Sequence, residues 1–213
     1  GPAMQSIALG TCIHILLGVE MKTGMIIGMG VVLLYTLSSG MWGVAMTDYV
    51  QFIFLTIGII VAAAIAYTEA GGWSGISAAV PASHFQLNMS DSVKFLCATA
   101  LPVLIDGNRY ARFFAAKDAN TARLSNFIVA FPQLMIAFMA MVMGLSAVVL
   151  LPAETPKDMV FATLLTTYLP IGVRGLAIVA LMAAIMSTAD SYMLTGATNV
   201  SVDIYKTIIN PNA

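Results

Sequence analysis

The sequence predicts an all-helical integral membrane protein, and three observations support this fold class. Of the 213 residues, 60% are hydrophobic and only 9% are charged, whereas a soluble domain carries roughly 25% charged residues. Six apolar segments are each long enough, or nearly so, to cross roughly 30 Å of hydrocarbon. The polar side chains inside these segments are few and gather in three places. We therefore expect a multi-pass protein of the plasma membrane that contacts the lipid bilayer along most of its surface.

The six expected transmembrane helices follow one another along the whole chain. The first is short for a full crossing, which is typical of an excerpt from a longer protein. The second and third almost touch, and Ser38-Ser39-Gly40 is the expected break between them. Thr47 or Asp48 would cap the third helix, because either side chain accepts a hydrogen bond from a free backbone N–H. The six segments cover residues 3–18, 22–45, 47–69, 93–115, 120–151 and 173–205.

The connections between these helices indicate their orientation in the membrane. A short helix lying on the membrane is expected near Trp73, a residue type that is enriched at membrane interfaces. Another extramembrane helix or hairpin is expected within the proline-rich residues 152–172. The loop between the fourth and fifth segments is cytoplasmic by the positive-inside bias. Its basic residues are Arg109, Arg112, Lys117 and Arg123.

A line of hydroxyl groups and one carboxylate lies inside the sixth apolar segment. At about 100° per residue, one face of this helix carries several small and polar side chains. Asp190 lies about 60° from Ser187, at the edge of this face. A carboxylate in hydrocarbon costs several kcal/mol unless it faces a partner, water or an ion. The residues on the face are Ala184, Ser187, Thr188 and Ser191, followed by Thr195 and Thr198.

Two interpretations of this polar face are open. Converging hard oxygen atoms are what a small cation such as Na⁺ needs, which favours ion-coupled transport. Alternatively, serine and threonine hydroxyls bond to the carbonyl four residues earlier or link membrane helices together. We expect ion coordination at Ser187 and Thr188, because Asp190 shares their level. For Thr195 and Thr198 we expect the structural role.

The other two polar clusters lie in residues 42–51 and 104–112. In the first, Asp48 is either a helix cap or an ion ligand. In the second, Asp106 and Asn108 flank Gly107 partway down an apolar helix. Glycine with polar neighbours is how membrane helices break and expose backbone to a substrate.

Asp106 also has a second interpretation. It could pair with Arg109, three residues further on, and simply help to end the helix. Gln5, in the first segment, is a further candidate for lining a solute cavity.

Other function classes find little support in the sequence. The scattered basic residues and net charge of −1 argue against a nucleic-acid surface. His14 and His84 have no histidine, cysteine or carboxylate neighbours at ligand spacing. With no nucleophile–base set either, we expect no enzyme activity and no cofactor apart from Na⁺ as a coupling ion.

Three motifs in order resemble those of the sodium:solute symporter family. The first is Met-Trp-Gly-Val-Ala-Met-Thr-Asp-Tyr-Val-Gln at 41–51. The second is Arg-Phe-Phe-Ala-Ala-Lys-Asp at 112–118. The third is Ala-Ala-Ile-Met-Ser-Thr-Ala-Asp-Ser at 183–191, followed by Asp-Ile-Tyr-Lys at 203–206.

The resemblance implies a LeuT-like fold of two inverted five-helix repeats, with solute and Na⁺ near the membrane midplane. The six segments would be the third to eighth of ten core helices, so the first, second, ninth and tenth are missing. The parent protein would then carry out Na⁺-coupled symport of an amino acid, organic acid or sugar by alternating access. The fragment alone is not expected to transport. An alternative is a symporter-like sensor module of a signalling protein.

The resemblance also implies roles for individual residues. At one sodium site, Ala184 would offer its carbonyl, and Ser187 and Thr188 their hydroxyls. A second sodium site would use Asp48 with Ser187 and Ser191, and Asp190 stands where some relatives have serine. Asp106 and Asn108 occupy the sixth-helix position at which relatives contact solute. A free Asp106 would favour a solute with an amine, whereas an Asp106 paired to Arg109 would not.

Overall fold

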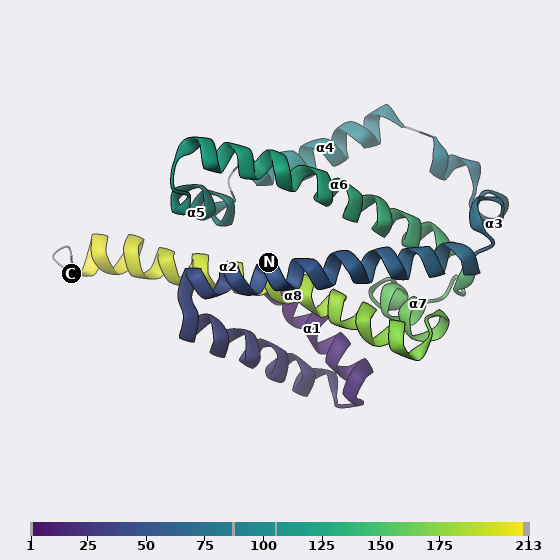
Figure 1. The fold of residues 1–213 in the computed structure, drawn as a ribbon, viewed down its shortest axis with the longest axis horizontal. Helices are drawn as coiled ribbons and strands as arrows, with labels where there is room; N and C mark the ends of the chain where they lie inside the picture. Colours follow the sequence, from purple (N-terminus) through teal and green to yellow (C-terminus); the bar gives the residue numbers. More distant parts are fainter. Residues whose placement is uncertain (1, 87, 105, 211–213) are drawn as a thin grey trace. The chain divides into compact units, whose positions relative to one another are not determined.

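The structure is a computed structural model that describes residues 2–86, 88–104 and 106–210 (Figure 1). These residues form helices and connecting turns with no strand among them, which confirms the all-helical prediction. The elements are α1 (Pro2–Leu17), α2 (Met21–Glu69), α3 (Gly72–Ala79), η1 (Ala82–Phe85), α4 (Met89–Leu104), α5 (Gly107–Ala115), α6 (Ala119–Leu150), η2 (Lys157–Met159), α7 (Val160–Tyr168), α8 (Ile171–Thr198) and the π-helix η3 (Asn199–Ile209). The chain divides into two compact units, residues 1–62 with 165–213 and residues 63–164.

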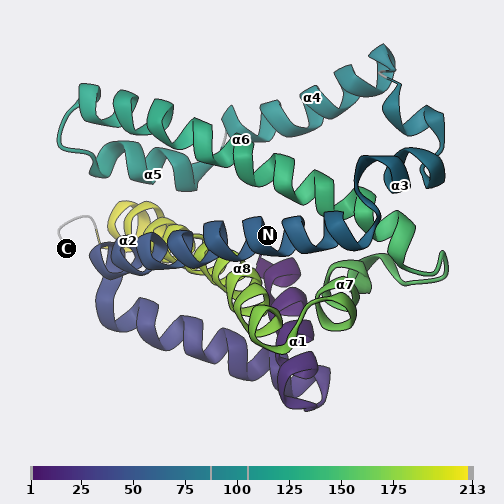
Figure 2. The same cartoon turned by 45° about the vertical axis from the view of Figure 1, so that its right-hand side comes forward.

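Helix α2 is bent sharply at Gly40, which has φ 56° and ψ −155° (Figures 1 and 2). This backbone conformation is essentially restricted to glycine. The break expected at residues 38–40 is therefore confirmed. The expected helix cap is wrong, because α2 resumes directly after Gly40 and runs through Thr47 and Asp48. The Thr47 hydroxyl donates instead to the carbonyls of Gly43 and Val44, at 3.1 and 2.9 Å.

Replacing Gly40 with alanine is expected to lower the stability of the helix pair. A side chain in this backbone conformation costs about 1–3 kcal/mol. The measurement is the thermal unfolding midpoint of the purified protein in detergent. Gly30→Ala is the matched control, because a Cβ at Gly30 meets no atom within 4 Å. Equal midpoints for the two variants would show that the bend does not depend on glycine.

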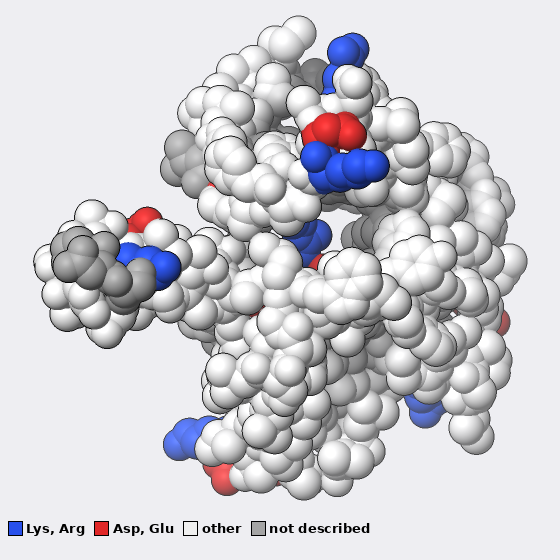
Figure 3. Space-filling model, turned by 60° about the vertical axis from the view of Figure 1, so that its left-hand side comes forward, with Lys and Arg blue, Asp and Glu red and all other residues white. Residues whose placement is uncertain are grey.

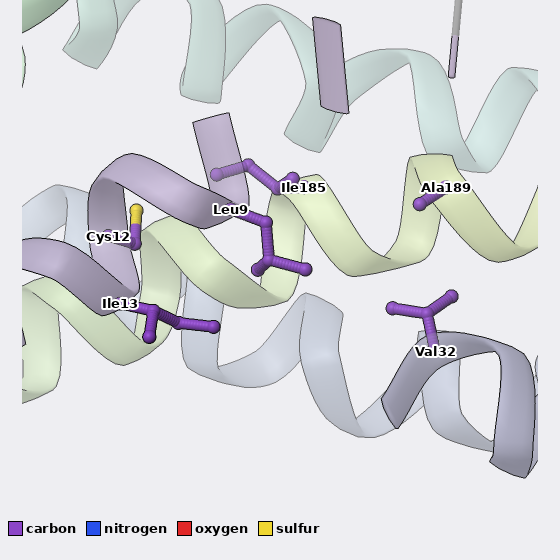
Figure 4. Packing of buried hydrophobic residues seen from close by; sticks show 6 residues of the cluster. All are labelled: Leu9, Cys12, Ile13, Val32, Ile185 and Ala189. Carbon is purple, nitrogen blue, oxygen red and sulfur yellow. The ribbon is translucent and has the colours of Figure 1, made fainter. Parts of the chain in front are cut away.

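The first unit is built around a core shared by α1, the first half of α2 and α8. Leu9, Cys12 and Ile13 of α1 belong to this core (Figure 4). Val32 of α2 and two residues of α8, Ile185 and Ala189, complete the cluster, and all six are at most 7% exposed. This packing fixes the rotation of α8, because Ile185 and Ala189 must face the core.

Two close helix approaches in this unit depend on glycine. A Cβ added at Gly24 of α2 would lie 2.8 Å from the carbonyl oxygen of Gly10 in α1. A Cβ at Gly58 would overlap the methyl group of Ala180 in α8. Small residues of this kind let membrane helices pack backbone to backbone. Gly58 therefore sets the distance between the second half of α2 and the helix that carries the polar stripe.

In the second unit, α3 packs against the end of α6. Ala70, Ile76 and Val80 form the buried cluster, covered by Leu145, Val149 and Leu150. The helices expected near Trp73 and within residues 152–172 are confirmed as α3 and α7. Asp118 caps the start of α6, where its carboxylate accepts a 2.7 Å hydrogen bond from the Thr121 amide. The Thr121 amide holds the pKa of this carboxyl below its ordinary value, so the cap is ionised at neutral pH.

Three helical stretches are long and apolar enough to cross a membrane. They are Met21–Glu69, Ala119–Leu150 and Ile171–Ile209, and Pro2–Leu17 is a shorter apolar helix. Large apolar side chains are exposed along them, including Leu34 at 67% and Phe131 at 76%. The face in Figure 3 is mostly uncharged, with few and scattered charges. These features fit helices that have lipid as their solvent.

Candidate cation site on α8

The polar stripe of α8 lies beside the buried core rather than within it. Asp190 is fully buried, while Ser187, Thr188 and Ser191 are half-buried. The Thr188 hydroxyl donates to the Ala184 carbonyl at 3.0 Å. The Ser191 hydroxyl donates to the Ser187 carbonyl at 2.9 Å. Both hydroxyls are therefore held against their own helix.

These hydrogen bonds are compatible with cation binding by the hydroxyl oxygens. A hydroxyl has one proton to donate and two lone pairs. When the proton bonds to a carbonyl of the same helix, as in Thr188, the lone pairs of the hydroxyl oxygen can still bind a cation. The Ala184 carbonyl is less available, because it accepts from the Thr188 hydroxyl in addition to the helical amide. The Thr198 hydroxyl makes the same type of bond to Leu194 at 2.9 Å, as expected for its structural role.

Asp190 is hydrogen-bonded to a tyrosine of α2. The Tyr35 hydroxyl donates to Oδ2 of Asp190 at 2.7 Å. The Gln51 side chain hydrogen-bonds to the same hydroxyl, and the charge of Asp48 acts on it. The Tyr35 hydroxyl is thus bonded to Asp190 and lies within electrostatic range of Asp48.

The bend at Gly40 makes this cluster possible. In a straight helix, Tyr35 and Gln51 would be separated by about 24 Å, since each residue adds about 1.5 Å. The bend instead folds the second half of α2 back toward the first (Figure 2). The Gln51 side chain is thereby close enough to interact with the Tyr35 hydroxyl. Asp48 and Gln51 are three residues apart and share one helix face. The result is an oxygen-rich cluster of two carboxylates, one amide and one phenol.

The cluster lacks the usual donors of a transition-metal site. The described part of the chain contains no group of three or more His, Cys, Asp and Glu residues that could hold a metal ion. Carboxylate, amide and hydroxyl oxygens are instead the donors that hard cations prefer. This donor set is suited to Na⁺ more than to zinc, copper or iron.

Two of the three predicted solute-binding residues, Asp106 and Asn108, belong to the second unit. In the second unit, α4 ends at Leu104 and α5 begins at Gly107, so the helix break expected at the glycine is confirmed. Asp106 caps α5 by accepting a 3.1 Å hydrogen bond from the Asn108 amide. The Tyr110 hydroxyl donates to the Leu104 carbonyl at 2.6 Å, across the break.

Asp106 also lies close to a positively charged side chain, Arg109 of α5. The Arg109 Nε atom lies 3.7 Å from Asp106 Oδ2, with the two side chains 43% and 32% exposed. The pairing with Arg109 that the alternative interpretation expects is therefore present, and the capping of α5 is an additional role of Asp106. Gln5 is half-buried on α1, in the first unit.

Comparison with known proteins explains this combination of helices and polar clusters. The chain matches the sodium:solute symporter family over residues 3–213. The chain belongs to this family. Its members are transporters, and the apolar helices agree with an integral membrane protein.

Curated relatives are similar over nearly the whole chain. It is 28% identical to the sodium/glucose cotransporter of Vibrio parahaemolyticus, covering 96% of this chain and 44% of that protein. It is 25% identical to the human high affinity choline transporter 1, with 97% and 39% covered. It is 26% identical to the high-affinity proline transporter PutP of Bacillus subtilis, with 96% and 45% covered. The chain thus spans less than half the length of these relatives.

Sequence reasoning did not identify two members of the polar cluster, Tyr35 and Gln51. Tyr35 lies in the apolar run Val31–Leu37, where a tyrosine is typical of a membrane helix. Gln51 is the last residue of the 41–51 motif, and the motif alone indicates no role for it. A signal was nevertheless present, because Gln51 follows Asp48 at helical spacing and a buried amide requires partners.

Proposed function

We propose that the full-length protein couples the inward flow of Na⁺ to the uptake of a small organic solute. One observation carries this proposal: Asp190, a fully buried carboxylate, lies on α8 beside a row of hydroxyls and reaches Tyr35. Ionisable groups inside membrane segments are costly and mark ion or substrate pathways. Membership of the sodium:solute symporter family supports Na⁺ as the ion.

Two cation sites are proposed on α8. The first would use the hydroxyls of Ser187 and Thr188 with the carbonyl of Ala184. The Ala184 carbonyl already accepts a hydrogen bond from Thr188, so the Thr188 hydroxyl would be a stronger ligand than this carbonyl. The second would use Asp48 and Asp190 together with the hydroxyls of Ser187 and Ser191. Oxygen atoms from helices outside residues 1–213 would complete the first site.

We further propose that the helices make six membrane crossings within a LeuT-like core in the plasma membrane. The parts of α2 before and after Gly40 would each cross once, since each approaches or exceeds the roughly 20 residues needed. Helix α1, the pair α4–α5, helix α6 and α8 with η3 would supply the others. The basic residues of α5 and early α6 would then face the cytoplasm.

Coupling would arise from alternating access. Na⁺ entering from outside would stabilise the outward-open state that accepts solute, because a ligand shifts an equilibrium toward the state it binds better. The solute would be an amino acid, organic acid or sugar, held in part by Gln5, Asp106 and Asn108. The relatives named for glucose and proline fall within this range. The Arg109 partner of Asp106 favours solutes other than simple amines.

The direct test is uptake by the full-length protein in proteoliposomes. Radiolabelled glucose, proline and choline are supplied under an inward Na⁺ gradient or an equal K⁺ gradient. We expect at least one solute to accumulate under Na⁺ and to remain near the protein-free background under K⁺. Equal accumulation under both gradients would contradict Na⁺ coupling.

A further inference from the structure

The hydrogen bonds of Tyr35 fix the orientation of the Gln51 amide. A phenol has one proton, and in Tyr35 that proton is donated to Asp190 at 2.7 Å. The hydrogen bond between Tyr35 and Gln51 must therefore be donated by the amide nitrogen to the phenol oxygen. The amide oxygen, Oε1 of Gln51, is consequently turned away from Tyr35.

This amide oxygen is buried without a hydrogen-bond partner among the described residues. A buried acceptor left without a donor is destabilising, and native structures rarely tolerate one. A cation satisfies such an oxygen as well as a donor does. Gln51 shares its helix face with Asp48, so its oxygen lies on the side of the helix that carries a carboxylate.

We propose that Gln51 Oε1 is a ligand of the second cation site and that Tyr35 is the positioning residue of that site. Tyr35 holds the Asp190 carboxylate by donating to it and holds the Gln51 amide by accepting from it. The phenol thus turns the oxygens of α8 and α2 toward one cation. This inference rests on the proposed Na⁺ coupling and adds two residues to its second site.

The test measures Na⁺ dependence in the full-length protein reconstituted in proteoliposomes. Gln51→Met keeps the length of the side chain and removes its oxygen, and Tyr35→Phe keeps the ring and removes the donor. Each is expected to weaken the apparent Na⁺ affinity about tenfold, which is the size of one hydrogen bond to a charged group. The solute KM at saturating Na⁺ should stay unchanged. Tyr49→Phe is the control, because Tyr49 lies in α2 but is 65% exposed.

A double-mutant comparison separates positioning from a general structural role. Combined with Asp190→Ala, Tyr35→Phe should cause a smaller loss of Na⁺ affinity than it does in the wild type, because one of the two groups it positions is gone. Additive losses would overturn the positioning role. Unchanged Na⁺ affinity in Gln51→Met would overturn the ligand role.

Two further outcomes keep the inference separate from the proposed function. If uptake by the wild type does not depend on Na⁺, the proposed function itself is contradicted. If a variant gives no uptake, the Na⁺-induced rise in its thermal unfolding midpoint in detergent is measured instead. If the unfolding midpoint of Gln51→Met or Tyr35→Phe rises at the same Na⁺ concentrations as that of the wild type, the inference is contradicted. If the rise requires higher Na⁺ concentrations, the inference is supported.

Discussion

Replacing Gly58 with leucine is expected to disrupt the packing of α2 on α8 and to abolish Na⁺-dependent uptake. Even a Cβ at this position would overlap the Ala180 methyl group and lie 3.3 Å from the Leu176 carbonyl oxygen. The backbone of α8 cannot give way as a flexible side chain would, so the helices must separate. Overpacking of this kind costs typically about 1–3 kcal/mol, and occasionally more. The measurements are the thermal unfolding midpoint in detergent and uptake by proteoliposomes.

Gly30→Leu is the matched control for this prediction. Gly30 belongs to the same helix, but a Cβ there meets nothing within 4 Å. We expect the control to purify and transport like the wild type. A Gly58→Leu protein with wild-type stability and uptake would show that the α2–α8 approach is not as close as described.

Replacing Thr188 with valine is expected to weaken the apparent Na⁺ affinity at least about tenfold. Valine preserves the branched shape and removes the hydroxyl oxygen that would bind the cation, and a lost ligand bond to a charge is worth this much. The change also removes the hydroxyl that donates to the Ala184 carbonyl. We do not expect the released carbonyl to replace the lost hydroxyl ligand. The measurement is the Na⁺ concentration that gives half-maximal uptake.

Thr198→Val provides a close control for Thr188→Val. Thr198 lies on the same helix and makes the same type of bond to the carbonyl four residues earlier, at 2.9 Å. It is exposed and lies away from Asp190 along the chain. Equal Na⁺ affinities in the two variants would show that the Thr188 hydroxyl has only a structural role in the helix and is not a cation ligand.

The helical organisation was largely predictable because hydrophobic runs are long and their interruptions are chemically distinctive. Gly40 and Gly107, each with polar neighbours, predicted two helix breaks, and the structure has a break at both positions. The cap expected at Thr47 failed for a physical reason. A glycine in an unusual conformation can bend a helix without leaving several orphan amides, and Thr47 then sits inside the helix.

The candidate site was predictable only along single helices. Helical periodicity placed Ser187, Thr188 and Asp190 near one another, because their spacing depends on one element alone. The Tyr35 partner of Asp190 lies 155 residues away in sequence. Such a contact depends on the bend of α2 and on the rotation of α8 against its core. Local patterns cannot specify either.

Binding of radioactive Na⁺ to the purified full-length protein tests the central claim, that α8 carries the oxygens of a sodium site. Wild-type protein, Thr188→Val and Thr198→Val are compared over a range of Na⁺ concentrations in the absence of solute. We expect saturable binding by the wild type and Thr198→Val, and binding displaced to about tenfold higher Na⁺ by Thr188→Val. Saturable binding of equal affinity in all three proteins would contradict a sodium site at Thr188.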